Sequence, residues 1–240
     1  PGSGGPSPAA VASVLHAGSL ARIDPGTGDA SRVIRDAPGL GRDADIRPNL
    51  AIGEGGVWMH VWPDGANALL QHFDEATGND RGRLQTQGAG AGLAVGSRTV
   101  WFSNGPPGEA RVYRINPLTH EELRPVAIGT GVVTDIVLGG GSLWVGSSDG
   151  TLTAFDPLTG RRLGAIEIEG TPDALAYGDG SVWALDLLQS EVMRIDPSSS
   201  EVIGRIPLGG NPGDIAAGDG GIWVLDPVAG TATEIDPLTE

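Results

Sequence analysis

The sequence predicts an all-β protein built from repeated units of about forty residues, and two recurring phrases support this prediction. The first phrase surrounds a tryptophan, as in GSVWA (181–185), and the second resembles RIDPxTG, as in MRIDPSSS (193–200). The tryptophans of the first phrase are Trp58, Trp101, Trp144, Trp183 and Trp223. The second phrase places an acidic or amide residue at Asp24, Asp74, Asn116, Asp156, Asp196 and Asp236. A fixed period of this length is typical of solenoids and β-propellers.

One repeat contains four short apolar segments. In residues 171–210 these segments are ALAYG (174–178), SVWALD (181–186), EVMRID (191–196) and EVIGRIPL (201–208). Their β-branched and aromatic residues, their length and the Gly, Pro and Asp between them are typical of strands. No window keeps apolar residues at helical spacing over a whole helix. Four antiparallel strands per repeat form one blade of a β-propeller.

The residue types in the turns between these strands explain how each turn can form. Gly178-Asp179-Gly180 supplies residues that adopt positive φ, which a tight hairpin requires. In the DPLTG turn, Asp156 can accept backbone amides ahead of it, Pro157 presets φ, and Gly160 can take a left-handed conformation. We therefore interpret the aspartates of the RIDPxTG phrase as structural and not as ligands.

The number of blades follows from the number of repeats. Six RIDPxTG-like phrases predict six four-stranded blades, of which the first is degenerate because no tryptophan precedes Asp24. Five blades are the alternative. In that case residues 31–35 close the final blade and leave a surplus segment at the N-terminus.

Each periodic tryptophan is expected to fill the space between two adjacent blades. The alternative is a row of aromatic side chains that binds carbohydrate, although such tryptophans normally lie on exposed loops. Trp62 falls outside the period and is the one expected to be exposed.

The ends of the chain suggest a tethered domain. Residues 1–10, PGSGGPSPAA, are expected to be a flexible linker, and residues 11–240 a single β-propeller domain. Because the chain does not begin with methionine, we expect it to be a tethered piece of a longer protein. A processed or tag-derived end is the alternative.

Composition excludes several classes of function. The net charge of −15 disfavours nucleic acid and anionic lipid as partners. The absence of cysteine excludes disulfides and thiolate chemistry. No apolar run is long enough to span a bilayer, so a membrane is expected only through a tether outside the chain. All basic residues are arginine, which we attribute to a GC-rich genome.

The paired GxVWV and RIDPxTG phrases, over roughly residues 18–240, resemble the YVTN-type propeller repeats of bacterial and archaeal surface proteins. They are also similar to PQQ-like and NHL repeats. The resemblance implies a bacterial, extracytoplasmic propeller, on the cell surface or secreted, of the kind carried by sensor kinases and regulators. Such repeats host many unrelated activities.

The resemblance also allows enzymes, and their motifs can be sought in this chain. Virginiamycin B lyase-like propellers use His and Glu with Mg²⁺, but His16, His60, His72 and His120 fall at unrelated points of the repeat. The acidic motif of plant-type glutaminyl cyclases and the cofactor clamp of PQQ dehydrogenases have no counterpart either. A catalytic role is therefore uncertain and disfavoured, and no catalytic residue is predicted.

A candidate ligand site remains at the mouth of the propeller. The starts of the inner strands and the ends of the second strands open on the same face and place polar residues there. The predicted ligand-binding residues are Asn49, Asn104, Asp135, Asp173, Asp186, Asp214 and Asp226. Such a rim suits a cationic ligand or a hard cation, so Ca²⁺ is the candidate cofactor, with Asp135 and Asp214 as its ligands. A solvated acidic surface with strand-end caps is the alternative.

These observations favour a non-catalytic extracytoplasmic propeller that binds a protein or a small molecule at one face, as a sensor or scaffold domain of a larger, membrane-anchored protein. The alternative is a metal-dependent lyase or hydrolase with its site on the propeller axis.

Overall fold

The protein is an all-β propeller with four-stranded blades, described here from a computed structural model. The structure describes residues 12–16, 19–23, 27, 30–34, 49–61, 67–87, 90–104, 111–129, 131–218 and 221–237. The predicted linker, Asp24 and Trp62 lie outside these residues. The chain divides into two compact units, Pro1–Ala89 and Gly90–Glu240. Among the described residues, no helix is long and apolar enough to cross a membrane.

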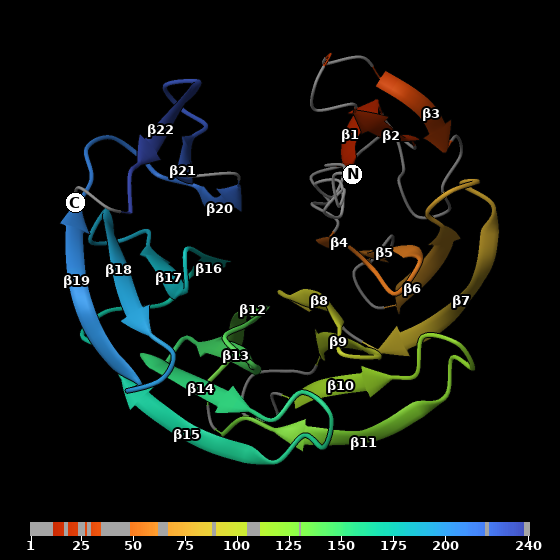
Figure 1. Cartoon of the computed structure of the whole chain (residues 1–240), viewed down its shortest axis with the longest axis horizontal. Coiled ribbons are helices and arrows are strands. Elements are labelled where there is room, and N and C mark those ends of the chain that lie inside the picture. Colours follow the sequence, from red (N-terminus) through yellow and green to blue (C-terminus); the bar gives the residue numbers. More distant parts are fainter. Residues whose placement is uncertain are drawn as a thin grey trace, which may run out of the picture. The chain divides into compact units, whose positions relative to one another are not determined.

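The first unit contains two antiparallel sheets (Figure 1). One sheet is formed by β1 (Ala12–His16), β2 (Ser19–Ile23) and β3 (Ala30–Ile34). The other is formed by β4 (Asn49–Gly53), β5 (Gly56–Val61), β6 (Asn67–Asp74) and β7 (Asp80–Gln87). Leu20 of β2 packs against Val57, Met59 and Phe73. A hydrophobic core therefore joins the two sheets.

The second unit contains four consecutive sheets, each in the order of the chain. The first of them is formed by β8 (Leu93–Gly96), β9 (Thr99–Asn104), β10 (Arg111–Ile115) and β11 (Glu122–Ala127), and the second by β12 (Val133–Gly139), β13 (Ser142–Ser147), β14 (Thr151–Phe155) and β15 (Arg162–Glu167). The third is formed by β16 (Ala174–Gly178), β17 (Ser181–Asp186), β18 (Glu191–Asp196) and β19 (Glu201–Pro207). The fourth is formed by β20 (Asp214–Gly218), β21 (Gly221–Asp226) and β22 (Thr231–Ile235). Within this unit the inner strands β12, β16 and β20 lie side by side, and β11, β15 and β19 are outermost (Figure 1).

Five sheets carry the periodic tryptophan on their second strand, and these are the five blades of the repeat. We number them from β4–β7, the first blade, to β20–β22, the fifth. The first four have four strands and the fifth has three. The prediction of six four-stranded blades is therefore wrong, and the alternative of five is the one observed.

The sheet β1–β2–β3 explains why the sequence suggested six. Its β2 contains the first part of the phrase ARIDPGTG, so it resembles a repeat. However, the register pairs Ala12 with Arg22, where the fourth blade pairs Trp183 with Arg194. Alanine thus occupies the tryptophan position, and no inner strand precedes β1 among the described residues. The five-blade alternative used residues 31–35 to close the final blade, whereas residues 31–34 lie in β3, which pairs with β2.

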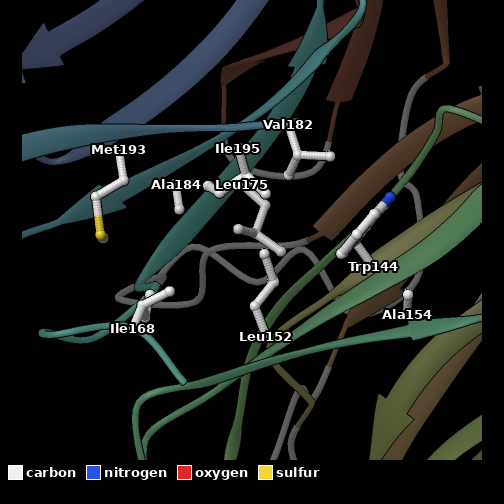
Figure 2. Close-up of a cluster of buried hydrophobic side chains, with 9 residues drawn as sticks. All are labelled: Trp144, Leu152, Ala154, Ile168, Leu175, Val182, Ala184, Met193 and Ile195. Atoms are coloured by element: carbon white, nitrogen blue, oxygen red, sulfur yellow. The ribbon is translucent and has the colours of Figure 1, made fainter. Parts of the chain in front are cut away.

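The periodic tryptophans join successive blades of the second unit, as predicted. Trp101, Trp144 and Trp183 are at most 1% exposed, and each packs into the hydrophobic cluster of the next blade. Figure 2 shows Trp144 and Leu152 of the third blade beside Leu175 and Val182 of the fourth. Trp223 is the exception, because 40% of its surface is exposed. The prediction that every periodic tryptophan fills an inter-blade space is wrong for this residue.

An arginine completes two of these tryptophan contacts. The Arg114 guanidinium lies 5.1 Å from the centre of the Trp101 ring, and Arg194 lies at the same distance over Trp183. Arg114 also donates hydrogen bonds to the carbonyl oxygens of Leu158 and Thr159, in the DPLTG turn of the next blade. Arg194 likewise donates to the Pro237 carbonyl oxygen, so each arginine connects its own tryptophan to a turn one repeat further along the chain.

The turn chemistry is as predicted. Asp156 Oδ1 accepts the Leu158 and Thr159 amides at 3.0 and 2.8 Å, and Gly160 adopts φ = 73°. In the hairpin at Gly178–Gly180, Asp179 and Gly180 have φ of 48° and 72°. These contacts define where each strand begins and ends.

Candidate functional site at the edge of the inner strands

The predicted site residues lie at one edge of the blades, where inner strands begin and second strands end. In the fourth blade Ala174 pairs with Leu185, and in the fifth Asp214 pairs with Leu225. Asn49, whose Cα partner is His60, holds the corresponding position in the first unit. We call the edge of the second unit the acidic edge. It contains Asn104, Asp135, Asp173, Asp186, Asp214 and Asp226.

Asp135 and Asp214 lie at the same sequence distance from the partner of the periodic tryptophan, although Asp135 lies where the register of β12 shifts and Asp214 pairs regularly with Leu225. Asp135 lies two residues before Val137, the partner of Trp144, and Asp214 lies two residues before Ala216, the partner of Trp223. Asp173 lies three residues before Ala176, the partner of Trp183. The register therefore places Asp173 one position away from the other two, as the sequence indicated.

Asp135 connects two adjacent blades. Its Oδ2 accepts the Leu175 amide of β16 at 2.8 Å, and its Oδ1 accepts the Ile136 amide at 2.7 Å. The pKa of Asp135 is raised to about 7, mainly by burial and in smaller part by the negative charge of Asp214, while the two amides act in the opposite direction. Because the carboxylate bonds the neighbouring inner strand, Asp135 has a structural role whether or not a ligand binds.

Asp173 and Asp186 lock the edge of the fourth blade reciprocally. Asp186, which is buried, accepts the Thr171 amide at 2.8 Å and the Gln189 amide at 2.7 Å. Asp173 in turn accepts the Leu187 amide at 2.9 Å. Burial raises the pKa of Asp173, and the charge of Asp186 adds to this effect.

Asp226 repeats the contacts of Asp186 in the fifth blade, where Gly213 takes the place of Asp173. It accepts the amides of Asn211, Val228 and Ala229 at 2.8 to 2.9 Å. These hydrogen bonds, that of Asn211 first, hold the pKa of Asp226 below its usual range. A side chain at Gly170 or Gly210 would collide with the carboxylates of Asp186 and Asp226, respectively. Glycine at these two positions therefore leaves room for the aspartate locks.

The side-chain oxygens of Asp214 and Asn104 do not connect one strand to another. Asp214 is exposed, and its Oδ1 accepts the amide of the next residue, Ile215, at 2.9 Å. Asn104 is 7% exposed, and its Oδ1 has no hydrogen-bond partner among the described residues. Within the same residues, no arginine forms an ion pair with Asp135, Asp173 or Asp214. The acidic edge thus has negative groups that an external cation could contact.

The geometry gives limited support to the predicted Ca²⁺ site. The described residues contain no group of three or more His, Asp or Glu side chains that could hold one metal ion. Asp135 and Asp214 influence each other electrostatically, but both oxygens of Asp135 already accept backbone amides. A Ca²⁺ site formed by Asp135 and Asp214 stays a hypothesis.

Sequence reasoning missed the contacts of two histidines and of two arginines. His72 stacks on Trp58 with ring centroids 3.8 Å apart, and buried His60 lies 3.2 Å from Thr86 Oγ1. Burial lowers the pKa of His60 to about 4, which makes it neutral at physiological pH. Arg114 and Arg194 were missed as inter-blade contacts. The recurrence of Arg two residues before the Asn or Asp of the phrase was the available signal.

Comparison with known proteins supports the fold and names no family. No protein-family model matches the chain, and no curated protein matches it. Among solved structures, the computationally designed Ika8 protein matches with a TM-score of 0.68 at 18% identity, over 93% of this chain and 66% of that one. A chain of the Mitotic Checkpoint Complex matches with a TM-score of 0.66 at 8% identity, over 93% and 72%. BamB from Moraxella catarrhalis matches with a TM-score of 0.55 at 16% identity, over 95% and 81%. The chain spans just under two-thirds of Ika8, and these identities establish similarity of fold alone.

Proposed function

We propose that this chain is a non-catalytic binding domain that recognises a cationic group of a protein or small molecule at its acidic edge. The observation that carries the proposal is that Asp135, Asp173 and Asp214 lie at one edge without an arginine ion pair among the described residues, and burial and neighbouring carboxylates raise the pKa of the first two. A cation that approached this edge would favour the ionised form of both groups. Exposed Asp214, in the next inner strand, would contribute a further carboxylate.

Most carboxylates of the acidic edge accept backbone amides, which argues against a catalytic role for them. A general acid or base must reach a proton of its substrate, and Asp186 and Asp226 instead hold strand ends together. The chain similar to this one in the Mitotic Checkpoint Complex belongs, by its name, to an assembly. This is consistent with a scaffold that binds protein.

The proposal includes the location suggested by the repeats. A YVTN-type or PQQ-like propeller tethered outside the bacterial membrane, in a larger sensor or regulator, agrees with the acidic composition and the regular repeats. BamB, a bacterial protein by its printed source, shares the fold.

Cross-linking of the full-length protein in its native cells tests whether a partner binds and whether it binds at the acidic edge. We expect a partner whose cross-links map near residues 171–173 and 211–214, and whose recovery falls in an Asp173→Asn/Asp214→Asn variant. The control variant Glu122→Gln/Glu201→Gln removes two exposed charges elsewhere and should keep the partner. Equal recovery from both variants would contradict binding at the acidic edge.

Two further results would contradict the rest of the proposal. Fractionation that finds the native protein in the cytoplasm would exclude an extracytoplasmic role. Turnover of lactones, pyroglutamyl precursors or cyclic depsipeptides by the purified protein would make it an enzyme.

A further inference from the structure

The loop between β17 and β18 presents two leucines to solvent. Leu187 and Leu188 are 41% and 92% exposed, respectively. We call residues 187–190 the leucine loop. It belongs to the fourth blade, which has four strands and whose inner strand β16 lies between β12 and β20. The leucines are therefore exposed in a blade that is complete and has a neighbour on either side.

Two aspartates hold the backbone of the leucine loop. Asp186 accepts the Gln189 amide at 2.7 Å, and Asp173 accepts the Leu187 amide at 2.9 Å. A partner that bound here would not have to order the backbone of the loop, which lowers the entropic cost of association. The loop thus offers its apolar side chains from a preformed position.

The equivalent loop of the third blade is polar. Four and five positions after the periodic tryptophan, the third blade has Ser148 and Asp149 where the fourth has the two leucines. Ser148 Oγ accepts the Val132 amide at 3.0 Å, and Asp149 Oδ1 accepts the Thr151 hydroxyl at 2.7 Å. Because polar residues form such a loop in the same sheet architecture, the turn itself does not require leucine.

Acidic groups lie beside the leucine loop. Asp173 bonds its backbone, and the carbonyl oxygen of exposed Glu169 accepts from Gln189 Nε2 at 3.5 Å. The arginine at this place, Arg205, forms its ion pair with Glu191. Among the described residues, neither Glu169 nor Asp173 has an ion pair. A cationic group would therefore meet two carboxylates next to an apolar surface.

This combination indicates the kind of partner. A second copy of the chain would bring its own net charge of −15, and an anionic lipid would meet the same two carboxylates, so both are disfavoured. A small free cation would leave the leucines uncovered. A protein segment with a basic side chain next to an apolar one complements both the charge and the apolar surface.

We infer that the leucine loop binds a segment of a partner protein in which a Lys or Arg lies next to an apolar side chain. The apolar side chain packs on Leu187 and Leu188, and the cation lies at Glu169 and Asp173. The inference rests on the proposed function, because Asp173 belongs to the acidic edge. It goes further in making the partner a protein and in naming its anchor.

Selection from a random peptide library displayed on phage, against the wild-type chain, tests the inference. We expect the selected peptides to combine a basic and an apolar residue. Their affinity should fall by roughly tenfold in Leu187→Ser/Leu188→Asp, which copies the third-blade loop, since the burial of leucine is lost. The control Leu118→Ser alters a leucine that is 85% exposed, between β10 and β11, and should change nothing. No selected peptide, or equal affinity for the two variants, would overturn the inference.

Charge and apolar contact can be separated with the same peptides. The change Leu188→Asp adds a negative charge, so binding by charge alone should tighten, whereas binding that needs the leucines should weaken. Glu169→Gln should weaken binding by about threefold, and Glu122→Gln, at an exposed position of β11, should not. On the wild-type chain, replacement of either the basic or the apolar residue of the peptide should lower affinity. This last measurement does not depend on the folding of a variant, and an unchanged affinity there would contradict the inference.

Cross-linking in native cells distinguishes this inference from the proposed function. A partner that is lost from Asp173→Asn/Asp214→Asn but kept by Leu187→Ser/Leu188→Asp would overturn the inference and leave the proposed function standing. A partner kept by both variants would contradict both. Vesicle binding or self-association of the wild-type chain that Leu187→Ser/Leu188→Asp abolishes would assign the leucines to lipid or to a second copy, and would also overturn the inference.

Discussion

Arg194 of the fourth blade donates a hydrogen bond of 2.9 Å to the carbonyl oxygen of Pro237, in the turn that follows β22 of the fifth blade. The same guanidinium lies over Trp183 and receives support from Ser181, whose hydroxyl accepts from Nε at 2.9 Å. The contact joins two segments 43 residues apart in sequence. Blade-to-blade contact in this protein is thus partly polar and directional.

Replacement of Arg194 by methionine tests this contact, because methionine keeps an apolar stem and removes the charge and the donors. We expect a loss of about 1–2 kcal/mol in the free energy of unfolding, since a hydrogen bond from a charged donor and a cation–π contact are removed. Urea denaturation measures the loss. Arg162→Met, at an exposed position of β15, is the control and should change stability little. Equal losses in both variants would contradict the role of Arg194.

The tryptophans should differ sharply in their contribution to stability. Trp183→Ala removes a fully buried ring between two blades and should cost about 3–5 kcal/mol. Trp223→Ala removes a ring that is 40% exposed and should cost about 1 kcal/mol. Thermal unfolding of the two variants checks the difference. Similar midpoints would show that Trp223 is covered in solution.

Titration of Asp135 should make the free energy of unfolding depend on pH. Its pKa rises from 3.8 in the unfolded chain to about 7 in the folded protein, so the folded state binds the proton more tightly. This contribution is fully present below about pH 4 and is lost as pH rises through 7, with an amplitude on the order of 4 kcal/mol. In Asp135→Asn this part of the pH dependence should disappear.

The measurement for Asp135 is the free energy of unfolding of wild type and variant between pH 4 and pH 8. This window avoids Asp74, whose pKa is lowered to about 2 by Thr77 and whose effect has the opposite sign, because it is lost as pH falls. Glu122→Gln serves as the control for the removal of one exposed carboxylate. A constant difference between wild type and Asp135→Asn across the window would disprove the assignment.

Two glycines of the third blade separate backbone strain from side-chain volume. Gly160 has φ = 73°, and a Cβ there would approach Arg114 Nη1 at 2.8 Å, whereas a Cβ at Gly164 meets nothing within 4 Å. We expect Gly160→Ala to cost about 1–2 kcal/mol, since alanine is strained at this φ and the atom displaces Arg114. Gly164→Ala should be neutral or slightly stabilising. The reverse order of stability in thermal denaturation would contradict the described turn.

The strands of the repeat could be predicted because their signals are local. The four segments expected at 174–178, 181–186, 191–196 and 201–208 correspond to β16, β17, β18 and β19, and only the last ends one residue earlier. Turn residues and alternating apolar side chains act within a few positions of the chain. The turn at Asp156 was predicted for the same reason.

The properties that depend on a neighbouring blade could not be predicted. Exposure of Trp223 depends on what lies beyond the fifth blade, and its phrase GGIWV looks the same as those of the buried tryptophans. Asp135 was correctly placed near the start of an inner strand, but its bond to Leu175 crosses from one sheet to the next. Local sequence carries no signal for such a partner. Whether the predicted site residues bind a ligand is untested.

The direction in which the tryptophans point implies a gradient of local opening along the second unit. Trp101, Trp144 and Trp183 each anchor the blade that follows, whereas β22 at the far end has a single strand partner. In native-state hydrogen exchange, the amides of β22 should therefore exchange through low-energy fraying, and those of β13 and β17 through cooperative opening of larger parts of the unit. Within the second unit, β22 would then be the least protected strand, and it would open while the strands covered by the tryptophans stay folded.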